Sequence, residues 1–158
     1  MLNGNPIRLK MLLVQGYFPG GHYSPVDGEA GFERDIMLVK RMGFNGIRMH
    51  QKIEDPRFLH LCDRHGLLVW TELPSPFLFS PVNERQYENE LWDVLDRDSG
   101  HASNMAVVLF NETWGIFDIL WSGKRKKYIR DLYARVKEGD GGVLFVRGSF
   151  ALDFDRVV

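Results

Sequence analysis

The sequence predicts an α/β fold in which a parallel sheet is built from successive strand–helix units. Two observations lead to this prediction. Short runs of apolar and β-branched residues, typical of strands buried on both faces, alternate along the chain with segments whose apolar residues recur at helical spacing. Each apolar run also ends at a polar residue or a glycine instead of continuing. Strand and helix in alternation are typical of right-handed βαβ units.

The expected elements can be placed in order along the chain. We expect strands at residues 8–14, 44–50, 67–74, 106–110 and 143–146, and helices at 32–42, 55–65, 83–95 and 122–137. A turn at Asn3 and Gly4 precedes the first strand, because this dipeptide readily adopts positive φ. Residues 18–31 are dense in glycine and proline and form a long loop, and loops of that length are often functional.

Particular residues mark the helix ends. Asp55 and Pro56 give a strong start signal, since a carboxylate caps the first N–H groups and proline suits the first helical position. Asn83 is expected to cap the following helix, with Gln86 at the capping-box position. Gly43 can close the first helix, because glycine tolerates the left-handed backbone of a helix end.

Composition and charge narrow the class of protein. A chain of 158 residues with 44% hydrophobic and 13% aromatic content can bury one substantial core. The net charge of −1 argues against nucleic acid or an anionic membrane as a general partner. The single Cys62 excludes an internal disulfide, and no histidine spacing indicates a metal site, so we expect neither metal nor cofactor. The apolar run at residues 11–14 is too short for a signal peptide or a membrane span, which predicts a soluble protein of unknown compartment, cytoplasmic by default.

Polar side chains stand where the apolar runs end. The fourth run is followed by Asn111, Glu112 and Trp114, and the second and third runs contain Arg48 and Glu72 near their ends. In a β/α barrel the carboxyl ends of the strands carry the chemistry, so these positions are candidate site residues. Glu112 can give or take a proton and Asn111 can hydrogen-bond a hydroxyl. Trp114 offers a flat apolar face, either for a sugar ring or for packing.

The charged residues at the second and third strand ends are expected to interact. An unpaired buried charge is very costly, so Arg48 needs a carboxylate partner, either Glu72 or Glu112. Glu72 is therefore either that partner or a residue that contacts substrate. His50 is a candidate substrate-binding residue, with a hydrogen-bonded structural histidine as the alternative.

Four motifs, in order along the chain, resemble one family. They are Leu2-Asn3-Gly4-x-Pro6-Ile7, Asp35-Ile36-x-x-x-Lys40-x-Met42-Gly43-Phe44-Asn45-x-Ile47-Arg48, Leu61-Cys62-Asp63-Arg64-x-Gly66-Leu67-x-Val69 and Phe110-Asn111-Glu112-Thr113-Trp114-Gly115. Together they resemble the catalytic barrel of glycoside hydrolase family 2, the β-galactosidase and β-glucuronidase family. The resemblance implies a partial (β/α)8 TIM barrel with about the first four to five β/α units, because a complete barrel needs about 250 residues.

The resemblance also implies a reaction, the hydrolysis of O-glycosyl bonds of terminal β-linked sugars with retention at the anomeric carbon. Retention needs two carboxyl groups about 5–5.5 Å apart, one the acid/base and one the nucleophile. Glu112 matches the acid/base, and Asn111 matches the residue that hydrogen-bonds the sugar 2-hydroxyl. Nothing in the chain matches the family nucleophile. The implied partner is a carbohydrate substrate, and the chain by itself is expected to be a fragment with half of the catalytic pair.

The extent of the resemblance suggests a division of the chain. We assign residues 1–138 to the N-terminal part of the catalytic barrel, and residues 139–158 to a fifth strand or to a tail outside the family. An open half barrel leaves backbone groups unpaired along its strand edges, which predicts self-association.

Two alternatives stay open. The first is a half barrel that binds carbohydrate or a partner chain without catalysis, through Trp114 and the surfaces of Phe77 and Phe79. An enzyme would lose turnover on Glu112→Gln, whereas such a module would keep its affinity. The second is another barrel class, such as a phosphosugar enzyme, whose phosphate site normally follows the last two strands of a complete barrel.

Overall fold

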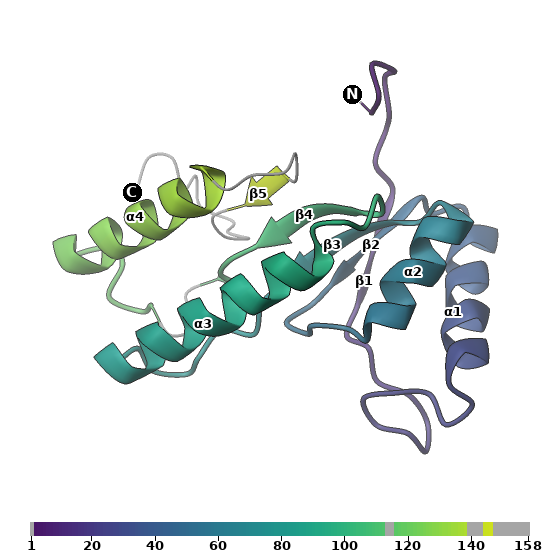
Figure 1. Ribbon diagram of the computed structural model, residues 1–158, viewed down its shortest axis with the longest axis horizontal. Helices are drawn as coiled ribbons and strands as arrows, with labels where there is room; N and C mark the ends of the chain where they lie inside the picture. Colours follow the sequence, from purple (N-terminus) through teal and green to yellow (C-terminus); the bar gives the residue numbers. More distant parts are fainter. Residues whose placement is uncertain (1, 113–115, 139–143, 147–158) are drawn as a thin grey trace.

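A computed structural model describes residues 2–112, 116–138 and the backbone of 144–146 (Figure 1). Within these residues the elements are β1 (Met11–Val14), α1 (Glu29–Arg41), β2 (Gly46–Met49), α2 (Pro56–His65), β3 (Leu68–Glu72), α3 (Pro81–Asp98), β4 (Asn104–Val108), α4 (Gly123–Glu138) and β5 (Leu144–Val146). The strands form one sheet in the order β1-β2-β3-β4-β5, and every pair of neighbours is parallel. The predicted α/β class and strand–helix alternation are therefore confirmed.

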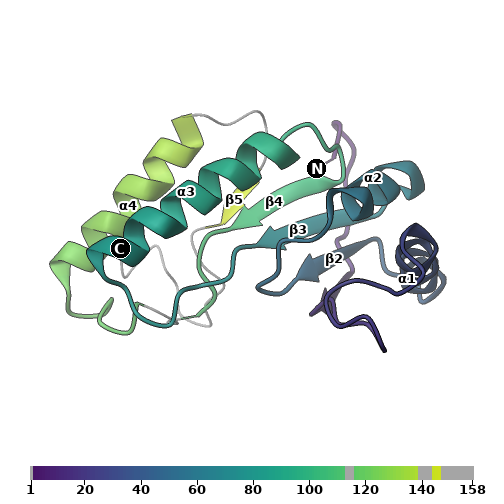
Figure 2. The same cartoon turned by 60° about the horizontal axis from the view of Figure 1, so that its bottom comes forward.

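The sheet has one face covered by helices. Figure 2 shows α2, α3 and α4 ranged along the same side of the sheet. Side chains alternate between the two faces of a strand, so Ile47 and Met49 of β2 pack under the helices while Arg48 points to the opposite face. In the strand register Arg48 lies opposite Trp70 of β3. A wall of sequential parallel strands with helices outside is one part of a β/α barrel.

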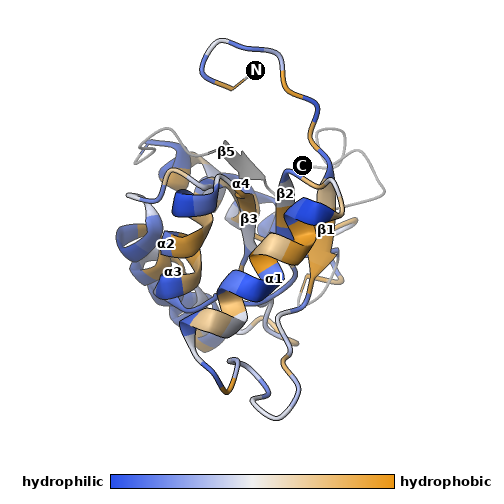
Figure 3. Cartoon of the chain, turned by 90° about the vertical axis from the view of Figure 1, so that its right-hand side faces the viewer, coloured by the Kyte–Doolittle hydropathy of each residue, from blue (hydrophilic) through white to orange (hydrophobic). Residues whose placement is uncertain are grey.

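The helix-covered face holds two clusters of buried side chains among the described residues. One joins α1 and α2 to β2 and β3, and the rings of Phe32 and Phe58 meet in it at a centroid distance of 5.5 Å. The other joins α3 and α4 to β4, where Tyr87 stacks on Phe110 at 5.3 Å. Figure 3 shows the corresponding pattern, with β1 hydrophobic and α1 divided between a hydrophobic and a hydrophilic side. Burying each such side chain stabilises the fold by roughly 1.5–3 kcal/mol.

Several turn and cap residues lie where the sequence predicts them, while most strand and helix bounds shift by one to three residues. Asp55 caps α2, because its carboxylate accepts a hydrogen bond of 2.9 Å from the N–H of Arg57, and Pro56 takes the first helical position. Gly66 closes α2 in the left-handed conformation, with φ at 63°. Gly43, with φ at 86°, follows directly on the C-cap residue of α1. The predicted turn at Asn3 and Gly4 is also present, since both residues have positive φ.

The prediction that Asn83 caps α3 is wrong. The cap is Ser80, whose hydroxyl accepts a hydrogen bond of 3.2 Å from the N–H of Asn83, and Pro81 is the first helical residue. Serine followed by proline supplies both the side-chain acceptor and the fixed φ of a helix start, so the helix begins earlier. The side-chain amide of Asn83 donates instead to the carbonyl of Leu78 at 2.6 Å.

The N-terminal end of the chain projects from the body of the molecule and runs back to it before β1 begins, as Figures 1 and 3 show. Across the described ranges, every helix is too short or too polar to cross a membrane.

Candidate active site

The carboxyl ends of β2, β3 and β4 bring the predicted site residues to one edge of the sheet. β2 ends at Met49 and is followed by His50, and β3 ends at Glu72 itself. The chain leaving β4 passes through the buried Leu109 and Phe110 to Asn111 and Glu112. Because parallel strands end on the same side, side chains that are more than sixty positions apart in the sequence, such as Arg48 and Asn111, become neighbours.

Arg48 ties the three strand ends together. Its Nε donates a hydrogen bond of 2.6 Å to Oε2 of Glu72, and its Nη2 donates one of 2.9 Å to Oδ1 of Asn111. The side chain of Glu72 is fully buried, while that of Arg48 keeps 22% of its surface exposed. A charge-assisted contact of this kind is short and directional, so it fixes the orientation of both acceptors. Of the two carboxylates expected as partners of Arg48, the structure places Glu72 against it.

Glu72 is a carboxylate with unused hydrogen-bonding capacity. Burial raises its pKa, the Arg48 guanidinium and the His50 ring act to lower it, and the charge of Glu112 raises it again; the pKa is raised overall. Its second oxygen, Oε1, accepts no hydrogen bond from any residue in the described part of the chain and lies 3.9 Å from Nε2 of His50. Buried carboxylate oxygens normally have partners, so this oxygen is an unsatisfied hydrogen-bond acceptor inside the candidate site.

Glu112 lies at the exposed rim of this group. Its backbone has a φ of 51°, a left-handed conformation that costs a non-glycine residue roughly 1–2 kcal/mol. Such backbone strain clusters at functional positions. Asn111 beside it is buried, with 4% of its surface exposed, and its N–H donates to Oγ of Ser75 at 3.4 Å. Trp114, the third candidate from this segment, lies outside the described residues.

The residues after β2 connect the site to the β3 end. The N–H of His50 donates to the carbonyl of Val14 at 2.8 Å, and its ring approaches Glu72. Gln51 has a φ of 48°, and its side-chain oxygen accepts a hydrogen bond of 3.2 Å from the N–H of Ser75. Ser75 thus links Gln51 to Asn111. Sequence reasoning did not identify Ser75, because no local pattern distinguishes it from other loop serines.

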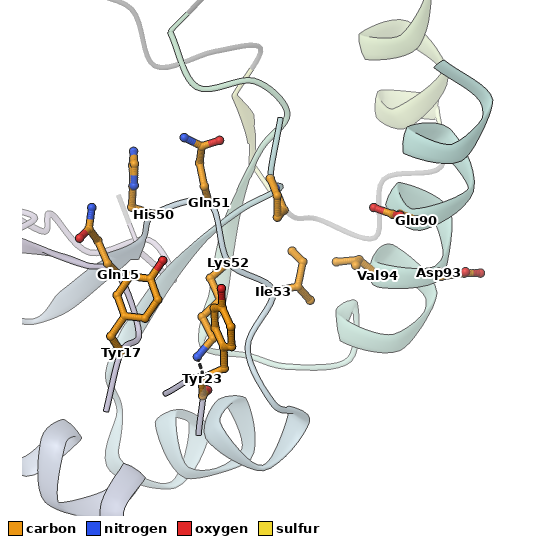
Figure 4. A pocket seen from close by; sticks show the side chains of 11 residues that line it. Gln15, Tyr17, Tyr23, His50, Gln51, Lys52, Ile53, Glu90, Asp93 and Val94 are labelled. Atoms are coloured by element: carbon orange, nitrogen blue, oxygen red, sulfur yellow. Dashed lines mark hydrogen bonds between the residues drawn. The ribbon is translucent and has the colours of Figure 1, made fainter. Parts of the chain in front are cut away.

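A large cavity adjoins the candidate site and includes His50 and Gln51 in its wall. Its volume is about 780 Å3, and its lining comes from the ends of β1 to β3 and from α3 (Figure 4). The residues that line it are Gln15, Tyr17, Tyr23, His50, Gln51, Lys52, Ile53, Pro74, Glu90, Asp93 and Val94. The length of the loop at residues 18–31 was the one sequence signal that could have indicated this cavity.

Phe77 and Phe79, the other surface that the sequence suggested for binding, lie in different environments. Phe77 has 68% of its surface exposed, and its ring lies 6.3 Å from that of Phe117. Phe79 instead packs against Tyr87 and Phe110, with ring centroids 5.9 Å away in both cases, so it belongs to the core. Among residues 2–112 and 116–138, no group of three metal-binding side chains lies close enough together to hold an ion.

The fold and this site define a segment of a β/α barrel enzyme with its polar side chains gathered at the carboxyl ends of the strands. Residues 26–145, more than half of the chain, match the family model described as "Glycosyl hydrolases family 2, TIM barrel domain". The chain belongs to this family, so the resemblance found in the sequence and the partial TIM barrel it implies are both confirmed.

Individual relatives are similar over part of their length. A β-galactosidase of Vibrio cholerae is 31% identical over 122 residues, which cover 71% of this chain and 12% of that protein. A β-glucuronidase of Bacteroides fragilis is 24% identical over 150 residues, covering 80% of this chain and 21% of that protein. The crystal structure of a β-glucuronidase from Parabacteroides merdae superposes with a TM-score of 0.79 at 23% identity, covering 90% of this chain and 19% of that one, and shows the shared fold. The chain therefore spans about a tenth to a fifth of the length of these proteins.

Proposed function

We propose that the chain carries the acid/base half of the active site of a retaining β-glycosidase. The observation that carries this proposal is the Arg48–Glu72–Asn111 group beside Glu112, at the strand ends where barrel enzymes hold their reactive groups. Family membership supports the reaction class, and the relatives named β-galactosidase and β-glucuronidase support terminal β-linked sugars as substrates.

In this proposal Glu112 protonates the glycosidic oxygen as the leaving group departs, and then activates the water that completes hydrolysis. Asn111 hydrogen-bonds the sugar 2-hydroxyl, a contact that strengthens in the oxocarbenium-like transition state. Arg48 acts as a positioning residue, because its hydrogen bond fixes the side chain of Asn111. His50 and Oε1 of Glu72 face the same edge and are assigned to substrate hydroxyls.

The covalent half of the reaction is assigned to a residue outside these 158 residues. Glu72 is the other carboxylate of this group, but its side chain is fully buried and paired with Arg48, so it is poorly placed to attack a substrate. The chain on its own then supplies the general acid but no nucleophile to attack the anomeric carbon.

Chemical rescue tests this assignment. Phenyl β-glycosides of galactose, glucose, mannose and glucuronic acid are incubated with the chain, with and without sodium azide. Azide attacks the anomeric carbon, the bond to the phenoxide breaks, and Glu112 gives the phenoxide its proton, so the products are the inverted glycosyl azide and phenol. We expect phenol release that needs azide and is lost in Glu112→Gln, while Glu29→Gln on the exposed start of α1 behaves like wild type.

Three results would each contradict a different part of the proposal: the missing nucleophile, the acid role of Glu112, or catalysis itself. Turnover without azide would mean that a second carboxylate acts within the chain or in a partner copy. Azide-dependent release that survives Glu112→Gln would remove Glu112 from the acid role. No release from folded protein on any of the four sugars would leave non-catalytic carbohydrate binding, the second candidate, which the cavity lined by Tyr17 and Tyr23 favours.

A further inference from the structure

We propose that the cavity beside the candidate active site is a subsite for a second, uncharged sugar unit. The ligand of this chain would then be a β-linked disaccharide or a longer saccharide, with one unit at Glu112 and the next in the cavity. The inference rests on the proposed function and adds to it the size and charge of the substrate. We call this space the aromatic cavity, after Tyr17 and Tyr23 in its wall.

The position and size of the aromatic cavity fit this role. Its volume of about 780 Å3 lies within the range of about 300–1,000 Å3 that small-molecule sites occupy. It shares His50 with the candidate site, and the ring of His50 is 3.9 Å from the buried, unpartnered oxygen of Glu72. Figure 4 shows Tyr17 and Tyr23 on one side of the cavity and Glu90, on α3, on the other. The cavity therefore borders the strand ends that carry the candidate site, with His50 as the shared residue.

Tyr17 and Tyr23 present an amphipathic surface to the cavity. They keep 66% and 65% of their surfaces exposed, and their ring centroids are 5.6 Å apart with the planes inclined by 47°. Aromatic rings with a polar hydroxyl suit ligands that have one apolar and one polar side. A pyranose is such a ligand, because its C–H groups lie on the ring faces and its hydroxyls around the rim.

A partly buried lysine, Lys52, holds the segment that carries the two tyrosines. Nζ of Lys52 donates to the carbonyl of Gly16 at 2.8 Å, to that of Tyr23 at 2.6 Å, and to Oε2 of Glu54 at 2.7 Å. These contacts fix both ends of the segment at residues 16–23. Inside it, the N–H of Phe18 donates to the carbonyl of His22 at 2.7 Å.

The loop is therefore set before a ligand arrives. Phe18 anchors it from below, since its ring meets Phe32 of the core at a centroid distance of 5.5 Å. Gly16 has a φ of 67°, and a Cβ there would lie 2.7 Å from the Lys52 side chain, so the segment is closely fitted to its lysine. A preorganised loop loses less conformational entropy on binding, which favours a ligand-binding site over a surface without a binding function.

The charges around the cavity predict that the sugar is neutral. Glu90 and Asp93 line the α3 side, and both are exposed carboxylates that can accept hydrogen bonds from hydroxyls. The cation on the other side, Lys52, is already paired with Glu54 and is only 12% exposed. A uronate in the cavity would face the carboxylate of Glu90, with Asp93 on the far side of the same helix and no free cation among the lining side chains, and like charges repel.

Binding measurements on the 158-residue chain test the proposal. The probes are methyl β-glucoside and methyl β-galactoside as single units, methyl β-cellobioside and methyl β-lactoside as neutral pairs, and the two pairs oxidised to a uronate in the reducing-end unit. By titration calorimetry or ligand-observed NMR, we expect at least one neutral pair to bind tenfold or more tightly than its single unit. Its uronate counterpart should lose most of that gain.

Variants separate the stacking and the charge contributions. Tyr17→Ala and Tyr23→Ala should remove the gain of the second unit and leave single-unit binding unchanged, while Tyr17→Phe and Tyr23→Phe keep the ring and the gain. The double change of Glu90→Gln and Asp93→Asn should restore binding of the uronate pair. Asp96→Asn, an exposed carboxylate of α3 outside the cavity lining, is the matched control and should restore nothing.

Specific results would overturn the inference. Equal affinity for one and two units, no effect of either alanine variant, no binding of any probe to folded protein, or equal affinity for neutral and uronate pairs would each do so. The azide experiment is independent of these outcomes. A disaccharide that binds through the tyrosines without azide-dependent turnover would contradict the catalytic role of Glu112 and leave the subsite standing.

Discussion

Within the described residues, the buried carboxylate of Glu72 has one close cationic partner, Arg48. The ring of His50 lies farther away. The arginine is held in turn by the strand register, because Ile47 and Met49 on either side are packed under the helices. Its contact with Glu72 should therefore matter more for positioning than for net stability, since the cost of desolvating a buried ion pair offsets much of its attraction.

Removing Arg48 alone measures a different quantity, the cost of leaving the buried carboxylate without its partner. Arg48→Met leaves Glu72 buried and unpaired, so we expect a loss of about 3–5 kcal/mol in the free energy of unfolding at pH 7. Glu72 has a folded pKa above its ordinary value of 4.5, and losing Arg48 raises that pKa further. At a pH between the pKa of Glu72 in the unfolded chain and its pKa in the folded protein, the folded state binds more protons. The free energy of unfolding therefore falls as the pH rises through this range. The deficit of Arg48→Met should thus shrink as the pH is lowered from 7 toward 4.5.

Urea unfolding of both proteins across this pH range measures the effect. Arg34→Met, which breaks the exposed pair with Asp27, is the control and should change stability little. Adding Glu72→Gln to Arg48→Met should recover part of the loss and flatten its pH dependence. A deficit of the same size at every pH would show that the arginine acts through packing alone.

Single residues also show where sequence reasoning ends. Arg48, Glu72, Asn111 and Glu112 could be selected because each follows or closes an apolar run. Ser75 and Lys52 could not, since their importance depends on partners up to 36 positions away, such as Asn111 for Ser75 and the carbonyl of Gly16 for Lys52. No local pattern encodes such contacts.

At the scale of single elements, α2 is the clearest case of local coding. Its cap, its first proline and its closing glycine all lie within the segment from Asp55 to Gly66, and its boundaries were predicted from them. α3 shows the opposite case, because the sequence predicts Asn83 as its cap and the structure has Ser80 three positions earlier. Ser80 caps the helix because Pro81 fits the first helical position, where its fixed φ suits the helix and its missing N–H has no intrahelical partner to lose.

The cap of α2 gives a prediction at this scale. Asp55→Ala should lower the free energy of unfolding by about 1 kcal/mol, because the first turn loses its side-chain acceptor. Asp55→Asn should stay within a few tenths of that of the wild type, since asparagine caps as well as aspartate. Urea denaturation at pH 7 distinguishes the two. Equal losses in both variants would assign the effect to the ion pair with Arg57 instead of the cap.

At the scale of the whole molecule, the sheet has a helix-covered face and a sparsely partnered one. On the second face Leu13 of β1 is 53% exposed, and Nε1 of Trp70 and Oε1 of Glu72 are buried without a partner among the described residues. The fold class was predictable because it depends on the alternation of patterns along the whole chain. What fills this face was not predictable, since a complete barrel of the family closes through further strands.

The edge of β1 leads to the last prediction. The carbonyls of Lys10 and Val14 accept hydrogen bonds from the β2 side, at 3.1 Å from Asn45 and 2.8 Å from His50. Residues alternate in direction along a strand, so the backbone groups of Met11 and Leu13 point away from β2, where the described structure places no other strand. Such an edge pairs readily with another chain, so we predict self-association of the chain at micromolar concentrations.

Light scattering coupled to gel filtration, over a dilution series, measures this association. Leu13→Lys places a charge at the edge and should shift the chain toward monomer, as charged side chains do on natural edge strands. Leu38→Lys is the matched control, because this leucine of α1 is 49% exposed but lies on a helix, and it should leave the association unchanged. A wild-type chain that stays monomeric at all concentrations and melts cooperatively would contradict the prediction. Equal dissociation in both lysine variants would place the contact away from β1.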